Sequence, residues 1–262
     1  MALSRNAKII LAVVVIGVFA VATPLVAFTL INAGAGINNG ISFKLIYNAG
    51  VMIEHNGVRI YVDPYQLPTT YSQYPADAIL VTHPHADHYD PVSINRILDT
   101  DTVCVFPENM TDAIALYDGI GVTPGDQVQV GHITITAFYM YTFSLQGYPA
   151  SHPAEANWTS YIIDINGFTF FHAGDSKDIP EYSQLSSIEV ALLPLGPGCQ
   201  TMTDQEVVDA LEEIDPQYFV PIHYNDDLNA DDTFIATYGT QITSMGIEIV
   251  HLEYYHATPH IF

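Results

Sequence analysis

The pattern of hydrophobic and polar positions divides the chain into one long apolar run and many short ones. Residues 9–31, IILAVVVIGVFAVATPLVAFTLI, are almost uninterrupted in their apolar character. From residue 42 onward, short runs rich in Val, Ile, Phe and Tyr alternate with Asn, Gly, Asp and Pro, a pattern typical of strands joined by turns. Helical periodicity is found in residues 92–99, 203–214 and 231–242. This alternation of strands and helices predicts a domain of the α/β class.

Several of the short runs are predicted to be strands. Residues 43–64 contain three of them, broken at Asn48-Ala49-Gly50 and at Asn56-Gly57, and Asn-Gly is a strong hairpin signal. Residues 157–175 contain two more, joined at Asn166-Gly167. The remaining predicted strands are residues 77–82, 102–106, 127–143, 188–196, 218–224 and 247–255. The continuous apolar runs among them are expected to be buried on both faces.

The long apolar run at residues 9–31 predicts a membrane anchor. A helix of this length spans a hydrocarbon core of about 30 Å. Arg5 and Lys8 precede it, which places the N-terminus in the cytoplasm and the domain outside. A signal peptide cleaved near Ala33-Gly34-Ala35, which would release a secreted domain, is the alternative. The chain therefore divides into residues 1–35, an anchor or signal segment with linker, and residues 36–262, the folded domain.

The charge balance excludes some partners. The sequence has 29 Asp and Glu against 6 Lys and Arg, a formal net charge of −23. Such a surface repels nucleic acid, because neutralising phosphates requires Lys and Arg. It suits a protein kept soluble in high salt or one facing an acidic exterior, and the sequence leaves both open. Cys104 and Cys199 make no disulfide framework, although a single bridge between them stays open. Nothing in the sequence indicates an oligomeric state.

Four metal-binding side chains follow one predicted strand directly. The sequence after residues 77–82 reads His83-x-His85-x-Asp87-His88. Imidazole nitrogens and carboxylate oxygens are ligands for zinc and similar metals. Residues two apart in an extended loop point the same way, so His83 and His85 can hold one cation. Asp87 and His88 are offset from them and could serve a second cation nearby.

The pattern extends to a family resemblance that covers about residues 42–252. THPHADH resembles the HxHxDH signature of the metallo-β-lactamase superfamily, and FTFFHAGDS, LLPLG, TMTDQEVVDAL and YFVPIHY resemble its later landmarks in the same order. NAGVMIEHNGVRIYVDP is similar to the opening hairpin region. The resemblance is strongest to the branch of L-ascorbate 6-phosphate lactonase-like hydrolases, and weaker to N-acyl-phosphatidylethanolamine phospholipase D. It implies a four-layer αββα sandwich with a dinuclear metal site at one edge.

The resemblance also implies a ligand set. It consists of His83, His85, Asp87, His88, Asp175 and His223, with Asp175 bridging the two metals. The family usually supplies one further histidine between HxHxDH and Asp175. His132 and His152 both lie in this interval, and His152 is preferred because it sits in a loop ahead of a strand pair.

Other polar residues near these motifs are expected to have supporting roles. His172 is expected to pack beside the site rather than to bind metal, and Asp63 to orient a ligand histidine. Asp90 is expected to cap a helix. Lys177 is expected to be a solvated surface lysine, with contact to an anionic substrate as the alternative.

The resemblance implies a metal-dependent hydrolase. Two divalent cations, Zn²⁺ first with Mn²⁺ or Fe²⁺ as alternatives, would activate a hydroxide that attacks an ester, lactone, amide or phosphodiester. Asp87 and Asp175 are the predicted catalytic residues. The predicted substrate is a small or lipid-like molecule. The alternatives are a catalytically silent scaffold and an iron-dependent oxidoreductase, although that branch carries a glutamate in place of His85 and an added flavin domain.

Overall fold

The computed structural model describes residues 40–196, 198–224 and 229–262, and their strands form two seven-stranded sheets. The first sheet has the order β14-β1-β2-β3-β4-β5-β6. Its strands are β1 (Ser42–Leu45), β2 (Val51–His55), β3 (Val58–Val62), β4 (Ala78–Leu80), β5 (Val103–Pro107), β6 (Ile120–Val122) and β14 (His260–Ile261). Strands β3 to β6 are parallel to one another, and the rest are antiparallel to their neighbours.

The second sheet has the order β13-β12-β11-β10-β9-β8-β7. Its strands are β7 (Gln127–Val130), β8 (Ile133–Tyr139), β9 (Thr159–Ile165), β10 (Phe168–His172), β11 (Val190–Pro194), β12 (Tyr218–Ile222) and β13 (Glu248–Ile249). Strands β10 to β13 are parallel, and β7 to β10 form an antiparallel series. Each sheet therefore carries a parallel half, and the parallel strands of a sheet end at one common edge.

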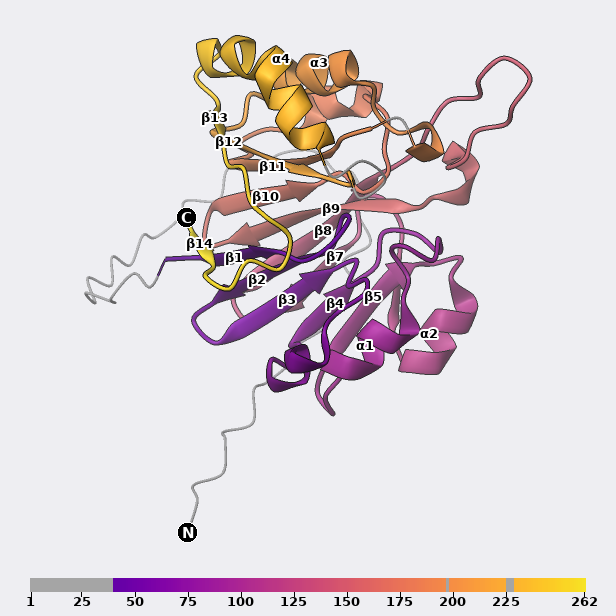
Figure 1. Cartoon of the computed structure of the whole chain (residues 1–262). Helices are drawn as coiled ribbons and strands as arrows, with labels where there is room; N and C mark the ends of the chain where they lie inside the picture. The colour runs from indigo at the N-terminus through magenta and orange to yellow at the C-terminus, as the bar shows by residue number, and fades with distance from the viewer. Residues whose placement is uncertain (1–39, 197, 225–228) are drawn as a thin grey trace, which may run out of the picture.

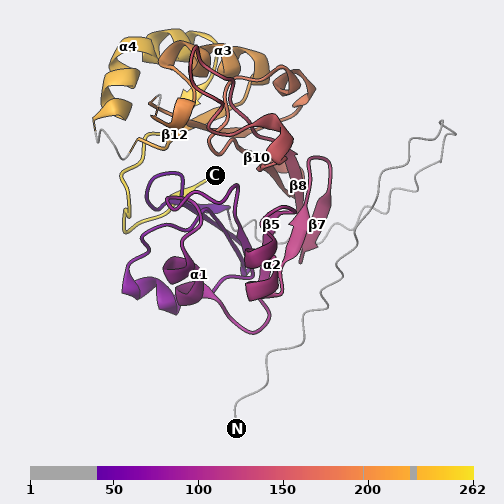
Figure 2. The same cartoon turned by 90° about the vertical axis from the view of Figure 1, so that its right-hand side faces the viewer.

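Helices cover the outer face of each sheet. The helices α1 (Pro91–Ile97) and α2 (Thr111–Tyr117) lie on the first sheet, and α3 (Asp204–Ile214) and α4 (Ala230–Ser244) lie on the second (Figures 1 and 2). The short 3₁₀ helices are η1 (Thr69–Gln73), η2 (Ala154–Ala156), η3 (Pro180–Gln184) and η4 (Gly198–Gln200). The predicted arrangement of two sheets between two layers of helices is confirmed.

Local sequence signals account for much of this framework. The β2–β3 hairpin turns at Asn56 and Gly57, with φ of 48° and 79°, and the β9–β10 hairpin turns at Asn166 and Gly167, with φ of 55° and 93°. Positive φ at both central residues is the type I′ turn that Asn-Gly favours. Asp90 caps α1 through the N–H of Val92, as predicted.

Strand β4 is buried on both faces, which explains its continuous apolar sequence. Ala78 and Leu80 belong to the core between the two sheets, and Ile79 packs in the second core beneath α1 and α2. The predicted burial of this strand is confirmed. Because the strand ends where its apolar run ends, the polar residues from Thr82 onward lie at the edge of the sheet.

The structure differs from the predicted elements in several places. Helix α2, of seven residues, and strands β6 and β14, of three and two residues, were not predicted, because elements this short carry little periodicity. Helix α1 is equally short, but Asp90 and Pro91 mark its start. The predicted strand 127–143 is two strands that turn at Gly131 and end at Tyr139. The predicted strand 247–255 is reduced to β13, because Tyr254 beyond it packs against Tyr224 and Tyr47.

Two further predictions concern the chain ends and the cysteines. The predicted anchor at residues 9–31 and the boundary at residue 36 lie outside the described residues. Among the residues that are described, no helix is long and apolar enough to cross a membrane. Cys104 is buried and Cys199 is exposed, and no disulfide joins them, so the bridge left open by the sequence does not form.

Candidate metal centre

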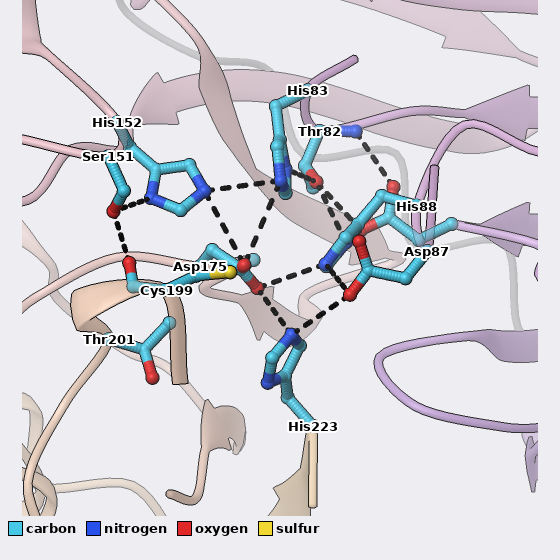
Figure 3. Close-up of polar contacts among 12 residues, drawn as sticks. Thr82, His83, Asp87, His88, Ser151, His152, Asp175, Cys199, Thr201 and His223 are labelled. Carbon is cyan, nitrogen blue, oxygen red and sulfur yellow. Dashed lines mark hydrogen bonds and ion pairs between the residues drawn. The ribbon is translucent and has the colours of Figure 1, made fainter. Parts of the chain in front are cut away.

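Four separate segments bring imidazole and carboxylate groups together at one edge of the sandwich. The loop after β4 supplies His83, His85, Asp87 and His88, and the segments after β10 and β12 supply Asp175 and His223. His152 arrives from the long loop between β8 and β9. All seven residues that the sequence suggested as metal ligands therefore lie in one cluster, and Figure 3 labels all of them except His85.

The first group consists of His83, His85, His152 and Asp175, whose donor atoms lie within 4.8 Å of one another. The Nε2 atoms of His83 and His152 are 3.2 Å apart. The Oδ2 atom of Asp175 lies 3.4 Å from Nε2 of His152 and 3.7 Å from Nε2 of His83. Ligands of a tetrahedral cation with bonds of about 2.0–2.1 Å lie roughly 3.3 Å apart. The spacing therefore fits one such cation.

The second group consists of Asp87, His88 and His223, and it shares Asp175 with the first. The Oδ1 atom of Asp175 lies 3.1 Å from Nε2 of His88 and 3.2 Å from Nε2 of His223. Oδ2 of Asp87 lies 3.5 Å from Nε2 of His223 and 3.7 Å from Nε2 of His88. One oxygen of Asp175 thus faces each group, as a carboxylate between two cations would.

Neighbouring groups fix which ring nitrogen each histidine presents. The hydroxyl of Thr82 donates to Asp63 and therefore accepts a hydrogen from Nδ1 of His83, 2.9 Å away. The hydroxyl of Ser151 donates to the carbonyl of Cys199 and accepts from Nδ1 of His152, 2.9 Å away. In both rings Nε2 is left with its lone pair directed at the cluster, which is the tautomer that a metal ligand requires.

Asp63 holds the third of these rings. It follows β3 directly with a φ of 46°, is fully buried, and accepts a hydrogen bond of 2.8 Å from Nδ1 of His88. This is the orienting role expected from the sequence. Among the described residues, the buried Nε2 atoms of His88 and His223 and both carboxylate oxygens of Asp175 have no hydrogen-bonding partner. Buried nitrogen and oxygen atoms without a hydrogen-bonding partner are costly, and coordination of metal ions would give these atoms partners.

The electrostatics of the cluster agree with this fit. Burial and the neighbouring His88 hold the pKa of His83 well below its ordinary value, so the ring stays neutral. Burial opposes charge on Asp175 too, but His88 and His223 outweigh it and lower the pKa of this carboxyl. Burial is likewise outweighed at Asp87, where His223 and His88 lower the pKa to about 2. Burial also opposes charge on His88 and His223, but Asp175 and the other neighbouring carboxylates outweigh it and raise the pKa of both rings. The cluster therefore offers ionised carboxylates and, at His83, a neutral imidazole.

Two residues that the sequence did not single out line the cluster. The indole of Trp158 lies 5.4 Å from the rings of His83 and His85 and 5.5 Å from that of His152, measured between ring centroids. Asn48 donates to Oδ2 of Asp87 over 3.1 Å, and its carbonyl accepts from the backbone of His223. Trp158 is the sole tryptophan of the chain and lies six residues after His152, a signal that sequence reading could have used.

The remaining candidates lie outside the ligand groups. His132, the rival of His152, hydrogen-bonds to His55 over 2.7 Å instead. His172 bonds to the carbonyl of Ala49 and accepts from the N–H of Gly174, so it supports the turn before Asp175. The expectation for Lys177 was wrong. This lysine is 7% exposed and forms an ion pair of 2.7 Å with Glu206, because the turn after Asp175 packs its side chain against α3.

Comparisons with known proteins agree with this architecture. The family model described as a β-lactamase superfamily domain matches residues 44–223. A UPF0173 protein of Pyrococcus abyssi is 30% identical over 182 residues, which cover 68% of this chain and 80% of that protein. A UPF0173 metal-dependent hydrolase of Nanoarchaeum equitans is 28% identical over 205 residues, or 71% of this chain and 84% of that protein.

Solved structures give the same result. A Parabacteroides distasonis protein, solved under the name of a metal-dependent hydrolase, superposes with a TM-score of 0.69 and 27% identity. The alignment covers 82% of this chain and 93% of that one. The resemblance to the L-ascorbate 6-phosphate lactonase-like branch stays a prediction. The family model matches more than half of the chain, and the Pyrococcus abyssi relative is 30% identical with 80% of its length covered. Together with the histidine–aspartate cluster, these matches show that this chain belongs to the metallo-β-lactamase superfamily and, within it, to the UPF0173 family.

Proposed function

We propose that this protein is a hydrolase that uses two divalent cations, Zn²⁺ first with Mn²⁺ or Fe²⁺ as alternatives, to cleave an ester, lactone, amide or phosphodiester. The observation that carries the proposal is Asp175, whose two buried oxygens face two separate groups of ligand atoms. Relatives of similar length are named metal-dependent hydrolases, which supports the same reaction class.

In this proposal each ligand residue has a defined task. His83, His85 and His152 would hold one cation, Asp87, His88 and His223 would hold the other, and Asp175 would contribute one oxygen to each group. A bound divalent cation lowers the pKa of coordinated water and so supplies a nucleophile at neutral pH. Thr82, Ser151 and Asp63 keep the imidazole rings from turning, and the indole of Trp158 lies beside the rings of the first group.

Asp87 is the best candidate to move a proton. It belongs to the second ligand group, yet its side chain remains 31% exposed, whereas that of Asp175 is fully buried. An ionised carboxylate in this position can accept a proton from water or pass it to a leaving group. We therefore assign proton transfer at Oδ2 to Asp87 and a purely bridging role to Asp175.

The two alternatives from the sequence are less well supported. A silent scaffold has no need to keep seven potential ligands, with their orienting partners, in one buried cluster. An iron-dependent oxidoreductase of this superfamily is expected to carry a glutamate where His85 stands. We also propose that residues 9–31 anchor the domain outside the cytoplasm, with Arg5 and Lys8 on the cytoplasmic side as the supporting observation.

A pair of histidine variants tests the proposed function. His152→Gln should lose at least half of the bound metal and reduce hydrolysis of a panel of esters, lactones, amides and phosphodiesters by 100-fold or more, a rough expectation for losing a ligand. His132→Gln removes the rival histidine, which binds His55, and should change neither. Metal content by elemental analysis and turnover by the metal-loaded protein are the readouts. Absence of any hydrolysis by the metal-replete wild type would reject the proposal in favour of a scaffold.

A further inference from the structure

The positive side chains of the described residues are all engaged in contacts within the protein. Lys44 donates to the carbonyl of Ala257, Arg59 pairs with Glu54, Arg96 donates to the carbonyl of Leu67, and Lys177 pairs with Glu206. Only Lys177 follows a cluster residue closely, and Glu206 neutralises it at 2.7 Å. No Lys or Arg in the part of the chain that the structure describes is therefore left to hold an anionic substrate.

This matters because the rest of the molecule is strongly acidic. The net charge of −23 repels anions at long range. Sites that recognise phosphate or carboxylate groups usually provide a guanidinium or ammonium group for them. A substrate with a charged group remote from the scissile bond would find no such partner among the described residues. The charge pattern points to an uncharged substrate.

An exposed apolar hairpin beside the cluster adds a second observation. It spans Phe143–Tyr148, and Phe143, Leu145 and Tyr148 are 45%, 52% and 71% exposed. These are three of the nine large hydrophobic side chains that the described residues expose. No Asp, Glu, Lys or Arg occurs in residues 127–154, in a chain where acidic residues abound elsewhere. Clustered exposed apolar groups usually mark a binding site.

The hairpin is attached directly to the first ligand group. The N–H of Tyr148 bonds to the carbonyl of Leu145, closing the hairpin, and the preceding Thr142 bonds to the backbone of His152 in both directions. Gln200 holds the segment that follows the hairpin. Its side-chain oxygen accepts from the N–H of Ser151, and its side-chain nitrogen donates to the carbonyl of Pro149. Figure 1 shows the loop between β8 and β9 extending beyond the layers of the sandwich.

We propose that the apolar hairpin binds the hydrocarbon part of an uncharged substrate whose carboxylic ester, lactone or amide group lies at the metal centre. This inference rests on the proposed function and narrows it, because it disfavours phosphodiesters and phosphorylated substrates. His152 is the link, since it belongs to the ligand group and its backbone pairs with the residue at which the hairpin begins.

Binding of hydroxamates tests the hairpin without requiring turnover, because a hydroxamate binds the metal itself. The full-length, metal-loaded chain is titrated calorimetrically with acetohydroxamate and octanohydroxamate, with all variants in the same detergent. Burying two methylene groups strengthens binding roughly fifteenfold. The wild type should therefore bind the longer compound at least about tenfold more tightly. The double variant Leu145→Ser, Tyr148→Ser should reduce that ratio to threefold or less.

A second double variant is the matched control. Leu116→Ser, Ile261→Ser removes two side chains that are 65% and 56% exposed in α2 and β14, and it should keep the wild-type ratio. An unchanged ratio in the hairpin variant, or an equal loss in the control, overturns the assignment. The monohydroxamate of suberic acid, with a carboxylate at the far end of a chain of equal length, should bind at least about tenfold more weakly than octanohydroxamate. Equal or tighter binding overturns the uncharged substrate class.

Turnover separates this inference from the proposed function. Hydrolysis of p-nitrophenyl octanoate by the metal-loaded wild type reports on the reaction. In one outcome the longer hydroxamate is preferred in a way that depends on the hairpin, while neither this ester nor any ester, lactone, amide or phosphodiester of the panel is hydrolysed. That result would reject the hydrolase function and leave the hairpin as a binding element. Hydrolysis with no such preference would reject the hairpin assignment and leave the function standing.

Discussion

At the scale of single residues, the centre depends on hydroxyl groups that never reach a substrate. Thr82 and Ser151 each donate their hydrogen elsewhere and so must accept one from an imidazole. This leaves His83 and His152 with free Nε2 atoms 3.2 Å apart. Two lone pairs so close repel each other unless a cation lies between them. Bringing the two lone pairs together therefore costs part of the free energy of folding, and a bound cation would offset this cost.

Ser151→Ala should weaken metal binding by about 10–100-fold, because His152 loses the acceptor that fixes its tautomer. Competition with a chromogenic chelator measures the affinity. Ser183→Ala is the control, since the Ser183 hydroxyl only bonds to the carbonyl of Pro180 at the surface. An affinity as high as that of the wild type would show that packing alone orients His152.

At the scale of elements, the termini of strands explain what could be predicted from the sequence. The run before His83 and the landmarks around Asp175 and His223 locate the ligands, because parallel strands of a sheet end at one edge. The contacts that orient the histidine rings cannot be located from the ends of strands, because their partners are far apart in the sequence. Ser151 meets the carbonyl of Cys199 across 48 positions, and Asn48 meets Asp87 across 39. Only the folded chain brings these pairs together, so the roles of Ser151 and Asn48 were missed, whereas that of Asp63 was expected from its place directly after a strand.

The turn after β10 carries a prediction at this scale. Gly174 has a φ of 57°, and a Cβ placed there would lie 2.6 Å from Sδ of Met140 and 3.2 Å from Thr82. Gly174→Ala should therefore displace Asp175 or Thr82, lower the free energy of unfolding by about 1–3 kcal/mol and reduce metal content. Denaturant midpoints and elemental analysis measure both effects.

The variant Gly125→Ala is the control, because it adds the backbone strain of a positive φ without a steric clash. Gly125 has a φ of 100°, yet an added Cβ would meet nothing within 4 Å. It should cost stability through its backbone alone and leave the metal content unchanged. Equal metal loss in both variants would contradict the role given to the close packing at Gly174.

At the scale of the whole molecule, the cluster joins the two halves of the sandwich. His83, His85, Asp87 and His88 follow a strand of the first sheet, whereas Asp175 and His223 follow strands of the second. Cations held by both sets would connect the sheets at this edge, in addition to the apolar core between them. Ligands that bind only the folded state raise its stability.

Removal of metal should therefore lower the thermal stability of the protein. At a free metal concentration 100 times Kd, binding contributes about 2.7 kcal/mol, which for a domain of this size corresponds to roughly 5–10 °C in Tm. Chelation followed by calorimetry should show this loss, and addition of Zn²⁺ or Mn²⁺ should restore it. His223→Ala should show a smaller shift than the wild type. A Tm independent of metal would mean that the cluster does not connect the sheets.

The direction of β1 determines on which side of the domain the chain enters the first sheet. Strand β1 runs antiparallel to β2 and hence in the same sense as β3, which ends beside the cluster at Asp63. The chain thus enters the first sheet at the end remote from the histidines. If residues 9–31 are held in a bilayer, as proposed, they join the described domain at the end of β1 that lies away from the histidine cluster.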